Sequence, residues 1–287
     1  METTKISILL PTRGRQEVLK TSVETLIDKC KNIKNVELLL GMDEDDSKTI
    51  DYVKNTLGPI CQEAKLETKA NIFKPLGYKN LHQYVNTLAG NAVGNWLFFW
   101  NDDCLMVTED WDEVIVSYTG QFKLLAPKDN HEGHPYAILP IVPNDWFILM
   151  GHLSQNPQND AWLSHIAYML DIFERIDVEF IHDRADITGN NDDETFQNRK
   201  YMEGNPSDPN DFGHSNMQQA RVNTAHKIAW FLEKTGKGDL TWWEKVKDGK
   251  QDPFEKMKWE DGVKGAGQLN AVNDEAPEFP DDHVISL

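Results

Sequence analysis

Short apolar runs alternate with helical patterns through the first hundred residues. The apolar runs have the length of strands and predict strands at 6–10, 36–40, 71–73 and 96–100. Between the first two runs, apolar side chains recur at helical spacing at Leu19, Val23, Leu26, Ile27 and Cys30. Further helices are predicted at 47–57 and from Asn80 onward. Strands that alternate with helices favour a doubly wound, mostly parallel sheet, in which ligands bind at the carboxyl ends of the strands.

The second half of the chain has a more mixed pattern. Its apolar runs predict short strands at 124–126, 137–142, 147–150 and 178–181, and its periodic segments predict helices at 160–173 and 217–234. Residues 189–211 are rich in Asn, Asp and Gly and predict a long loop. The helical pattern weakens beyond Gly236. We therefore expect an α/β fold, Rossmann-like in its first half and mixed in its second, with a helical C-terminal extension.

Composition and charge narrow the class of protein. The 287 residues carry 29 Lys and Arg against 47 Asp and Glu, a net charge of −18, which argues against a broad nucleic-acid-binding surface. No apolar run approaches the roughly 20 residues that span a bilayer, and the polar N-terminus has no signal-peptide pattern, so a cytoplasmic protein without a transmembrane segment is expected. Cys30, Cys61 and Cys104 are widely spaced, which predicts reduced thiols rather than a disulfide framework or a zinc motif.

Acidic side chains follow the fourth predicted strand directly. Asn101, Asp102 and Asp103 come after an apolar strand, where carboxylates can bind a divalent cation that bridges two phosphates. The same three residues are also suited to an ordinary turn. Two further polar segments, 11–15 and 41–46, follow the first and second strands. In a parallel sheet all three segments meet at one edge.

The order and spacing of these segments resemble the GT-A glycosyltransferases, especially the family-2-like inverting enzymes, over roughly residues 5–190. The resemblance implies that Pro11, Thr12 and Arg13 line the nucleotide site and that Arg15 lies near the phosphates. It implies that Asp43 contacts the base, expected to be uracil. The alternative for the two arginines is a solvated turn with surface ion pairs.

The resemblance also implies a metal site for Mn²⁺ or Mg²⁺. Asp103 would be the main ligand, with Asp102 on the ribose or the metal. Asn101 stands where the family's motif has its first acid, and an amide is a poorer ligand. A late histidine, His182, is the candidate for a further ligand, with a hydrogen-bonded histidine at a strand end as the alternative. The fallback ligands are Asp183 and Asp186.

Three other segments carry candidate chemistry. Lys79 and Asn80 border the donor in similar enzymes, although Asn80 also suits a helix N-cap. Asn159 and Asp160 open a predicted helix where the family places its catalytic base; either residue could instead cap that helix. The motif at 131–134 has two histidines but lies in a Gly- and Pro-rich stretch, so it predicts a loop rather than a zinc site.

These expectations define one domain organisation and one function. Residues 1–190 form the catalytic core, with a nucleotide-sugar-binding half at about 1–104 and an acceptor half at about 105–190; residues 191–248 form a loop and C-terminal helices, and 249–287 an acidic, flexible tail. The predicted activity is metal-assisted, inverting transfer from a UDP-sugar to a hydroxyl of a glycan, a lipid-linked sugar or a hydroxymethylated base in phage DNA. A sugar-phosphate nucleotidyltransferase and a non-catalytic nucleotide-sugar-binding module are the alternatives. The sequence carries no signal for a particular oligomeric state.

Overall fold

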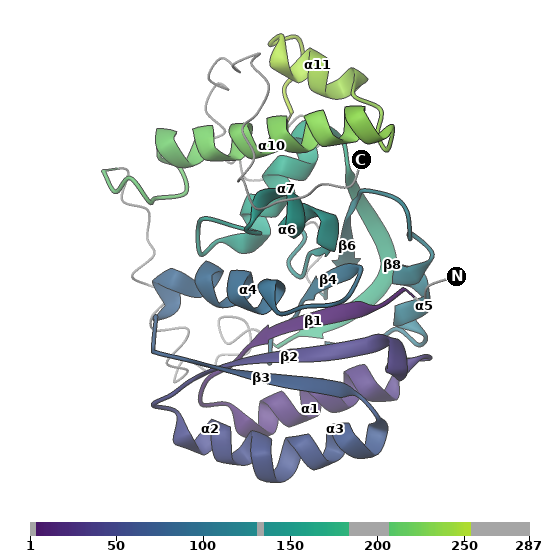
Figure 1. Cartoon of the computed structure of the whole chain (residues 1–287), viewed down its shortest axis with the longest axis vertical. Coiled ribbons are helices and arrows are strands. Elements are labelled where there is room, and N and C mark those ends of the chain that lie inside the picture. Colours follow the sequence, from purple (N-terminus) through teal and green to yellow (C-terminus); the bar gives the residue numbers. More distant parts are fainter. Residues whose placement is uncertain (1–3, 131–134, 184–206, 254–287) are drawn as a thin grey trace.

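A twisted sheet runs through the middle of the molecule (Figure 1). The computed structural model describes residues 4–130, 135–183 and 207–253. Within them, eight strands follow the order β3-β2-β1-β4-β7-β6-β8-β5. The first four, β1 (Ile6–Pro11), β2 (Val36–Asp43), β3 (Glu67–Phe73) and β4 (Trp96–Phe99), are mutually parallel. Their carboxyl ends therefore lie along one edge of the sheet, as the sequence predicts.

The remaining strands make the sheet mixed. β7 (Ile141–Pro143) is antiparallel to β4 and to β6 (Leu124–Lys128), whereas β8 (Phe173–His182) runs parallel to β6. The last strand in the order, β5 (Cys104–Met106), pairs antiparallel with the end of β8, with Cys104 opposite His182. This pairing brings the end of β8 back to the segment that follows β4.

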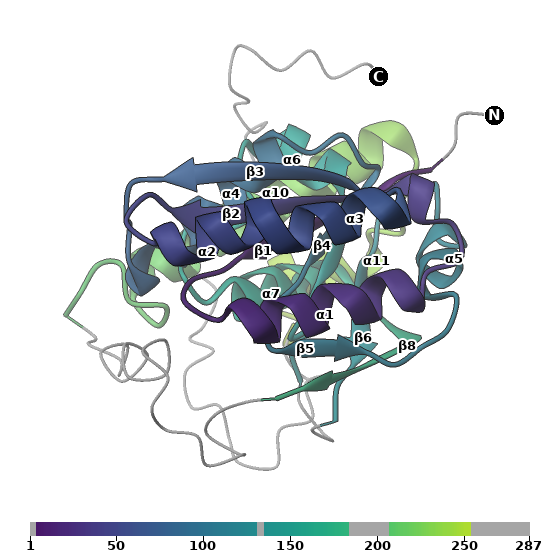
Figure 2. The same cartoon turned by 90° about the horizontal axis from the view of Figure 1, so that it is seen from below.

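One face of the parallel sheet is covered by the first helices (Figures 1 and 2). These are α1 (Gln16–Asp28), α2 (Ser47–Tyr52) and α3 (Gly58–Ala64), with a π-helical turn at Val53–Leu57 between the last two. A short helix, α5 (Trp111–Val116), follows β5. Alternate residues of the strands point to this side, so that Ile8, Leu38 and Phe98 share a core with Leu19 and Val23 of α1.

The opposite face is covered by α4 (Leu81–Gly90), α6 (Asn144–Met150) and α7 (Asn159–Leu170), with α10 (Ser215–Thr235) and α11 (Thr241–Lys247) stacked beyond them (Figure 1). Leu9, Leu39 and Leu97 of the strands enter one continuous core with Ile228 of α10 and Val246 of α11. The C-terminal helices are therefore part of the main core. Trp242 Nε1 also donates a hydrogen bond of 3.0 Å to the Tyr168 carbonyl, which ties the start of α11 to the end of α7.

Several predicted elements differ from the structure. Residues 147–150 belong to α6 rather than to a strand, because Trp146, Leu149 and Met150 are buried while Ile148 is 46% exposed, which is helical spacing. The strand predicted at 137–142 is confined to Ile141–Pro143. Helical structure after β2 continues to Ala64, beyond the predicted end at residue 57. Beyond Gly236, where the pattern weakens, the chain forms α11.

Some expectations fall outside the described residues. They include the 131–134 loop, Asp186, most of the 189–211 loop, the boundary placed at residue 190, and the tail from 254 onward. Among the helices that the structure does describe, none is long and apolar enough to cross a membrane.

Candidate functional site

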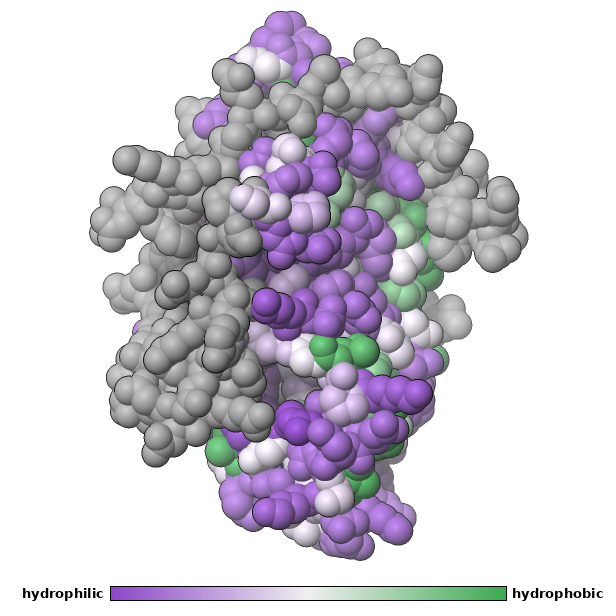
Figure 3. Space-filling view, turned by 90° about the vertical axis from the view of Figure 1, so that its left-hand side faces the viewer, coloured by the Kyte–Doolittle hydropathy of each residue, from purple (hydrophilic) through white to green (hydrophobic). Residues whose placement is uncertain are grey.

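The candidate site lies at the edge where β1, β2 and β4 end. In Figure 1 the strands β1, β2 and β3 point toward the left, and Figure 3 faces that side of the molecule, where the described surface is mainly hydrophilic. Polar segments follow β1, β2 and β4, and they meet at this edge, as the parallel topology predicts. The contacts among them divide into a group around Asp43 and a group around Asp102 and Asp103.

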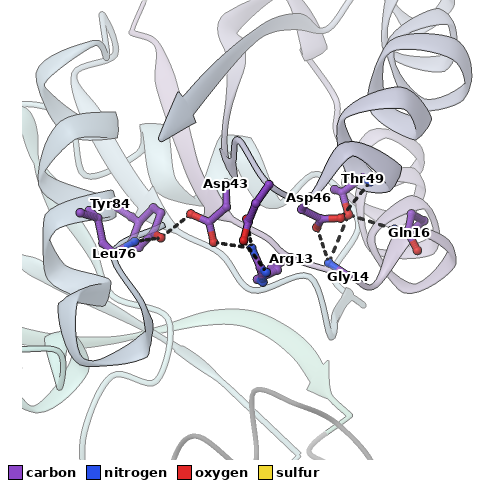
Figure 4. A network of polar contacts seen from close by, with 9 residues as sticks. Arg13, Gly14, Gln16, Asp43, Asp46, Thr49, Leu76 and Tyr84 are labelled. Carbon is purple, nitrogen blue, oxygen red and sulfur yellow. Dashed lines mark hydrogen bonds and ion pairs between the residues drawn. The ribbon is translucent and has the colours of Figure 1, made fainter. Parts of the chain in front are cut away.

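The turn after β1 is fixed by hydrogen bonds to its neighbours. Thr12 N donates to the Gly41 carbonyl at 2.8 Å, which continues the pairing of β1 with β2. Gly14 has a φ of +71°, a conformation that glycine adopts at little cost. Its N–H donates to Asp46 Oδ2 at 2.8 Å and to Thr49 Oγ1 at 3.1 Å, both at the start of α2 (Figure 4). These bonds set the direction in which Arg13 and Arg15 leave the backbone.

Asp43, the last residue of β2, is held from two sides (Figure 4). Arg13 Nη1 donates to its Oδ2 at 3.0 Å, and the Tyr84 hydroxyl donates to its Oδ1. Tyr84 in turn accepts a hydrogen bond of 2.8 Å from Leu76 N. Burial, and then the hydrogen bond to Asp43, raise the pKa of Tyr84 to about 12, so the phenol stays protonated and donates. Arg13 also bridges to Asp45, at 2.5 and 3.2 Å.

Asp102 and Asp103 are joined by Arg15. Arg15 Nη2 lies 2.6 Å from Asp102 Oδ1, and its Nη1 lies 3.1 Å from Asp103 Oδ2. Thr12 Oγ1 donates to the other oxygen of Asp102 at 2.7 Å. Only 1% of the Asp102 side chain is exposed, and a carboxylate so far from water requires a cation and hydrogen-bond donors close by. Arg15 and Thr12 supply them.

His182 completes this group from the end of β8. Its Nε2 lies 3.3 Å from Asp103 Oδ1, and its backbone N–H donates to Asn130 Oδ1 at 2.8 Å. Burial favours the protonated acid at Asp103, but the hydrogen bond and charge of His182, and then the charge of Arg15, outweigh it and lower the pKa of Asp103. Asp103 is therefore an anion at neutral pH.

The donor atoms here fit a divalent cation. Asp103, Cys104 and His182 each offer a ligand atom, and these atoms lie within 4.8 Å of one another. Burial, and then the nearby Asp103, raise the pKa of the Cys104 thiol well above its usual value, so Cys104 offers no thiolate. A carboxylate and an imidazole remain; the carboxylate is a ligand that Mn²⁺ and Mg²⁺ prefer, and the imidazole is a ligand for divalent transition metals. His182 Nδ1 is buried and has no hydrogen-bond partner among the described residues.

The turn interpretation of Asn101 to Asp103 also holds. Cys104 N donates to the Asn101 carbonyl at 3.2 Å, and Ser22 Oγ donates to the same carbonyl at 3.3 Å. The segment is thus a turn that carries two acids inward. Of the fallback ligands, Asp183 has an exposed side chain, and its N–H donates to the Asp103 carbonyl at 2.9 Å.

The segment before α4 is tied to the group around Asp43. Asn80 occupies the N-cap position of α4 but its side chain makes no capping bond; its Nδ2 donates to the Leu76 carbonyl at 2.7 Å instead. Lys79 is exposed and forms no ion pair within the described part of the chain. Because Leu76 N binds Tyr84, this segment is linked through Tyr84 to Asp43.

Asp160 lies on the first turn of α7. The helix begins at Asn159 and its N-cap position is Gln158, whose side chain makes no capping bond, so the alternative in which Asn159 or Asp160 is the N-cap residue is wrong. Tyr136 lies close by: burial, and then the charge of Asp160, raise its pKa to about 12. The Tyr136 hydroxyl also lies 3.3 Å from His165 Nε2. That Asp160 acts on an acceptor stays a prediction.

Two functional contacts were not predicted from the sequence. Tyr84 falls on the apolar stripe of its helix and reads as a core residue, yet its hydroxyl holds Asp43. A buried tyrosine usually finds a polar partner for its hydroxyl, which is the signal that could have pointed to this role. Asp45 belongs to an acidic run without an individual assignment, and the structure pairs it with Arg13.

The strand order and the helices on both faces of the sheet define the class of fold, a mixed α/β, GT-A-like, Rossmann-type fold. Among solved structures, the chain is similar to the mannosyltransferase PcManGT from Pyrobaculum calidifontis in complex with GDP-Man and Mn²⁺, with 11% identity, a TM-score of 0.53, and coverage of 85% of this chain and 79% of that one. It is also similar to residues 1–349 of S. aureus TarS in complex with UDP-GlcNAc, with 12% identity, a TM-score of 0.51, and coverage of 85% and 70%.

These comparisons concern the fold. Against a longer TarS chain the match covers 82% of this chain but only 43% of that one, so this chain spans less than half of its length. No protein-family model and no curated protein matches the sequence. The expected α/β, GT-A-like fold is confirmed.

Proposed function

We propose that this protein is a glycosyltransferase that moves a sugar from a nucleoside-diphosphate sugar to an acceptor hydroxyl. The observation that carries the proposal is the pair of carboxylates after β4, Asp102 and Asp103, joined by Arg15 and flanked by His182. A nucleotide-sugar transferase needs cationic and metal-binding groups where a diphosphate departs. The fold shared with a mannosyltransferase that binds GDP-Man supports the same conclusion.

The nucleoside would bind at the ends of β1 and β2. Pro11, Thr12 and Arg13 line this part of the site, and Asp43 would accept from the base, for which uracil remains the expectation. Because Tyr84 and Arg13 already hold both oxygens of Asp43, the carboxylate is fixed in position before a base arrives.

The diphosphate would lie over the second group. Arg15 offers a guanidinium next to Asp102 and Asp103, and Lys79 or Asn80 would contact a phosphate or a sugar hydroxyl from the segment before α4. Asp103 and His182 would hold Mn²⁺ or Mg²⁺, and Asp102 would bind the ribose or the same cation. A divalent cation bound there supplies positive charge that stabilises the departing diphosphate.

The chemical step would be a single displacement. The acceptor oxygen forms a bond to the anomeric carbon as the bond from that carbon to the diphosphate oxygen breaks, and the electron pair leaves with the nucleoside diphosphate. Asp160 takes the proton of the acceptor hydroxyl, and the anomeric configuration inverts. Glycans, lipid-linked sugars and hydroxymethylated DNA bases are the acceptor classes to test.

The test begins with nucleotide binding. Thermal unfolding is measured with UDP, GDP, CDP, ADP and TDP, each with Mn²⁺ or with EDTA; a ligand at 100 times its Kd stabilises the folded state by about 2.7 kcal/mol. We expect one base to give a shift that needs the metal. Transfer is then measured with the matching sugar nucleotides. Absence of any nucleotide shift would contradict the proposal, and pyrophosphate release from a nucleoside triphosphate and a sugar phosphate would indicate a nucleotidyltransferase instead.

A further inference from the structure

Asn86 of α4 holds the loop that leads into α7. Its Oδ1 accepts hydrogen bonds from Leu153 N at 2.7 Å and from Ser154 N at 3.3 Å, and its Nδ2 donates to the Ser154 carbonyl at 2.8 Å. One side chain thus satisfies three backbone groups of a segment that belongs to neither a helix nor a strand. A backbone group that is buried without a hydrogen-bond partner destabilises the folded protein. By supplying partners to three of them, Asn86 fixes this part of the loop.

The hydrogen bonds continue from Ser154 to the first turn of α7. Ser154, which is fully buried, donates from Oγ to the Asn156 carbonyl at 2.7 Å and accepts from Asn156 N at 3.1 Å. Asn156 Oδ1 accepts from Gln158 N at 3.0 Å, and the Gln158 carbonyl accepts from Trp162 N at 2.9 Å. Asp160 lies between these last two residues. A continuous series of contacts therefore runs from Asn86 to the turn that carries Asp160.

The same helix also fixes the nucleotide side of the site. Tyr84 lies two residues before Asn86 on α4, and its hydroxyl holds Asp43 at the end of β2. Successive helical residues are rotated by about 100°, so side chains two positions apart point in nearly opposite directions. One turn of α4 thus contacts the Asp43 group on one side and the 153–158 loop on the other.

We propose that Asn86 is a positioning residue that sets the place of Asp160 relative to the bound donor. The inference rests on the proposed function, in which Asp160 accepts the proton of the acceptor hydroxyl. A proton acceptor works only within hydrogen-bond reach of that hydroxyl, and a displacement of about 1 Å costs roughly 100-fold in rate. Asn86 contributes no atom to the reaction and acts through the loop.

The experiment compares Asn86→Ala, Asp160→Asn and the double variant, with Thr87→Ala as the matched control. Thr87 is exposed, and within the described residues its hydroxyl donates only to the Gln83 carbonyl of its own helix, at 2.9 Å. For Asn86→Ala we expect kcat to fall roughly 10- to 100-fold while the donor KM and the nucleotide-induced thermal shift change less than about 2-fold. Thr87→Ala should keep the wild-type kcat.

The double variant tests the route of the effect. If Asn86 acts through Asp160, Asn86→Ala should lower kcat by less than about 2-fold in the Asp160→Asn background, because the two changes are coupled. Equal factors in both backgrounds, or an Asn86→Ala kcat equal to that of Thr87→Ala, would overturn this inference and leave the proposed function intact. A wild-type protein that transfers no sugar would instead overturn the proposed function.

A second variant, Ser154→Ala, keeps the inference testable if Asn86→Ala does not fold. Ser154→Ala removes the link between the Ser154 hydroxyl and Asn156 but leaves the three bonds of Asn86 in place, since these involve only the backbones of Leu153 and Ser154. It should reproduce the fall in kcat with an unchanged nucleotide shift. A wild-type kcat in Ser154→Ala would contradict the proposed route through the loop.

Discussion

His165 should make the folded protein sensitive to mild acid. Its side chain is buried in α7, 4% exposed, between the Tyr136 hydroxyl and the ring of Phe212, whose centroid lies 5.1 Å away. Burial, and then the positive charge of Arg221, lower the pKa of His165 to about 3. The folded protein therefore keeps this imidazole neutral at pH values where an unfolded chain protonates it.

The sign and size of the effect follow from proton linkage. Between pH 3 and the unfolded-state pKa of about 6.5, the unfolded chain binds more protons at this position, so stability rises with pH. The contribution of His165 is complete above about pH 6.5 and is lost as the pH falls below it. At pH 5 the loss relative to pH 7.5 is about 2 kcal/mol, and any folded-state pKa below about 4 gives nearly the same value.

Urea unfolding followed by circular dichroism at pH 7.5 and pH 5.0 measures this loss. In His165→Phe, which keeps an aromatic ring against Phe212, the decrease in the free energy of unfolding between the two pH values should be about 2 kcal/mol smaller than in the wild type. Carboxyl groups and other histidines titrate in both proteins and cancel in the comparison. Equal decreases in the two proteins would refute the assignment of a buried, neutral His165.

Three further predictions concern the site and the sheet. Asp103→Asn should abolish the metal-dependent part of the nucleotide-induced thermal shift and lower kcat at least about 100-fold, as measured with Mn²⁺ and with EDTA. Tyr84→Phe should reduce the free energy of unfolding by about 1–3 kcal/mol in urea, because a buried oxygen of Asp43 loses its donor. Gly94→Ala would place a methyl carbon 2.4 Å from the Ser7 hydroxyl oxygen of β1 and should destabilise the protein by about 1–3 kcal/mol. As a control, Gly90→Ala should be tolerated, because the atom nearest to its methyl carbon would be 3.6 Å away.

Most of the parallel half of the fold follows from the sequence pattern. The run that becomes β4 is apolar at every position, because Phe98 and Leu97 face the cores on opposite sides of the sheet. The 147–150 run was wrongly predicted as a strand, because four consecutive apolar residues carry no period of their own. The burial of Trp146, Leu149 and Met150, at helical spacing around an exposed Ile148, reveals a helix, and that burial depends on tertiary packing.

The acids of the site could be predicted from the sequence, whereas the residues that contact them were harder to predict. Asp43 and Asp103 follow strands that must end at one edge, so their gathering there is a consequence of topology. The contact between His182 and Asp103 depends on the pairing of β5 with β8, and β5 has only three residues, too few to give a pattern. The role of Tyr84 was hidden because its ring packs with the core while its hydroxyl reaches Asp43.

The core shared by β1 and α11 has a consequence for synthesis on the ribosome. Leu9 is synthesised long before Val246 of α11, which belongs to the same core. At a translation rate of roughly 5–20 residues per second, on the order of 10–50 s pass between the synthesis of β1 and that of α11, the helix that completes this core. During that interval the face of the nascent sheet later covered by α7, α10 and α11 is exposed apolar surface, and we expect a chaperone to bind there until α11 has left the exit tunnel.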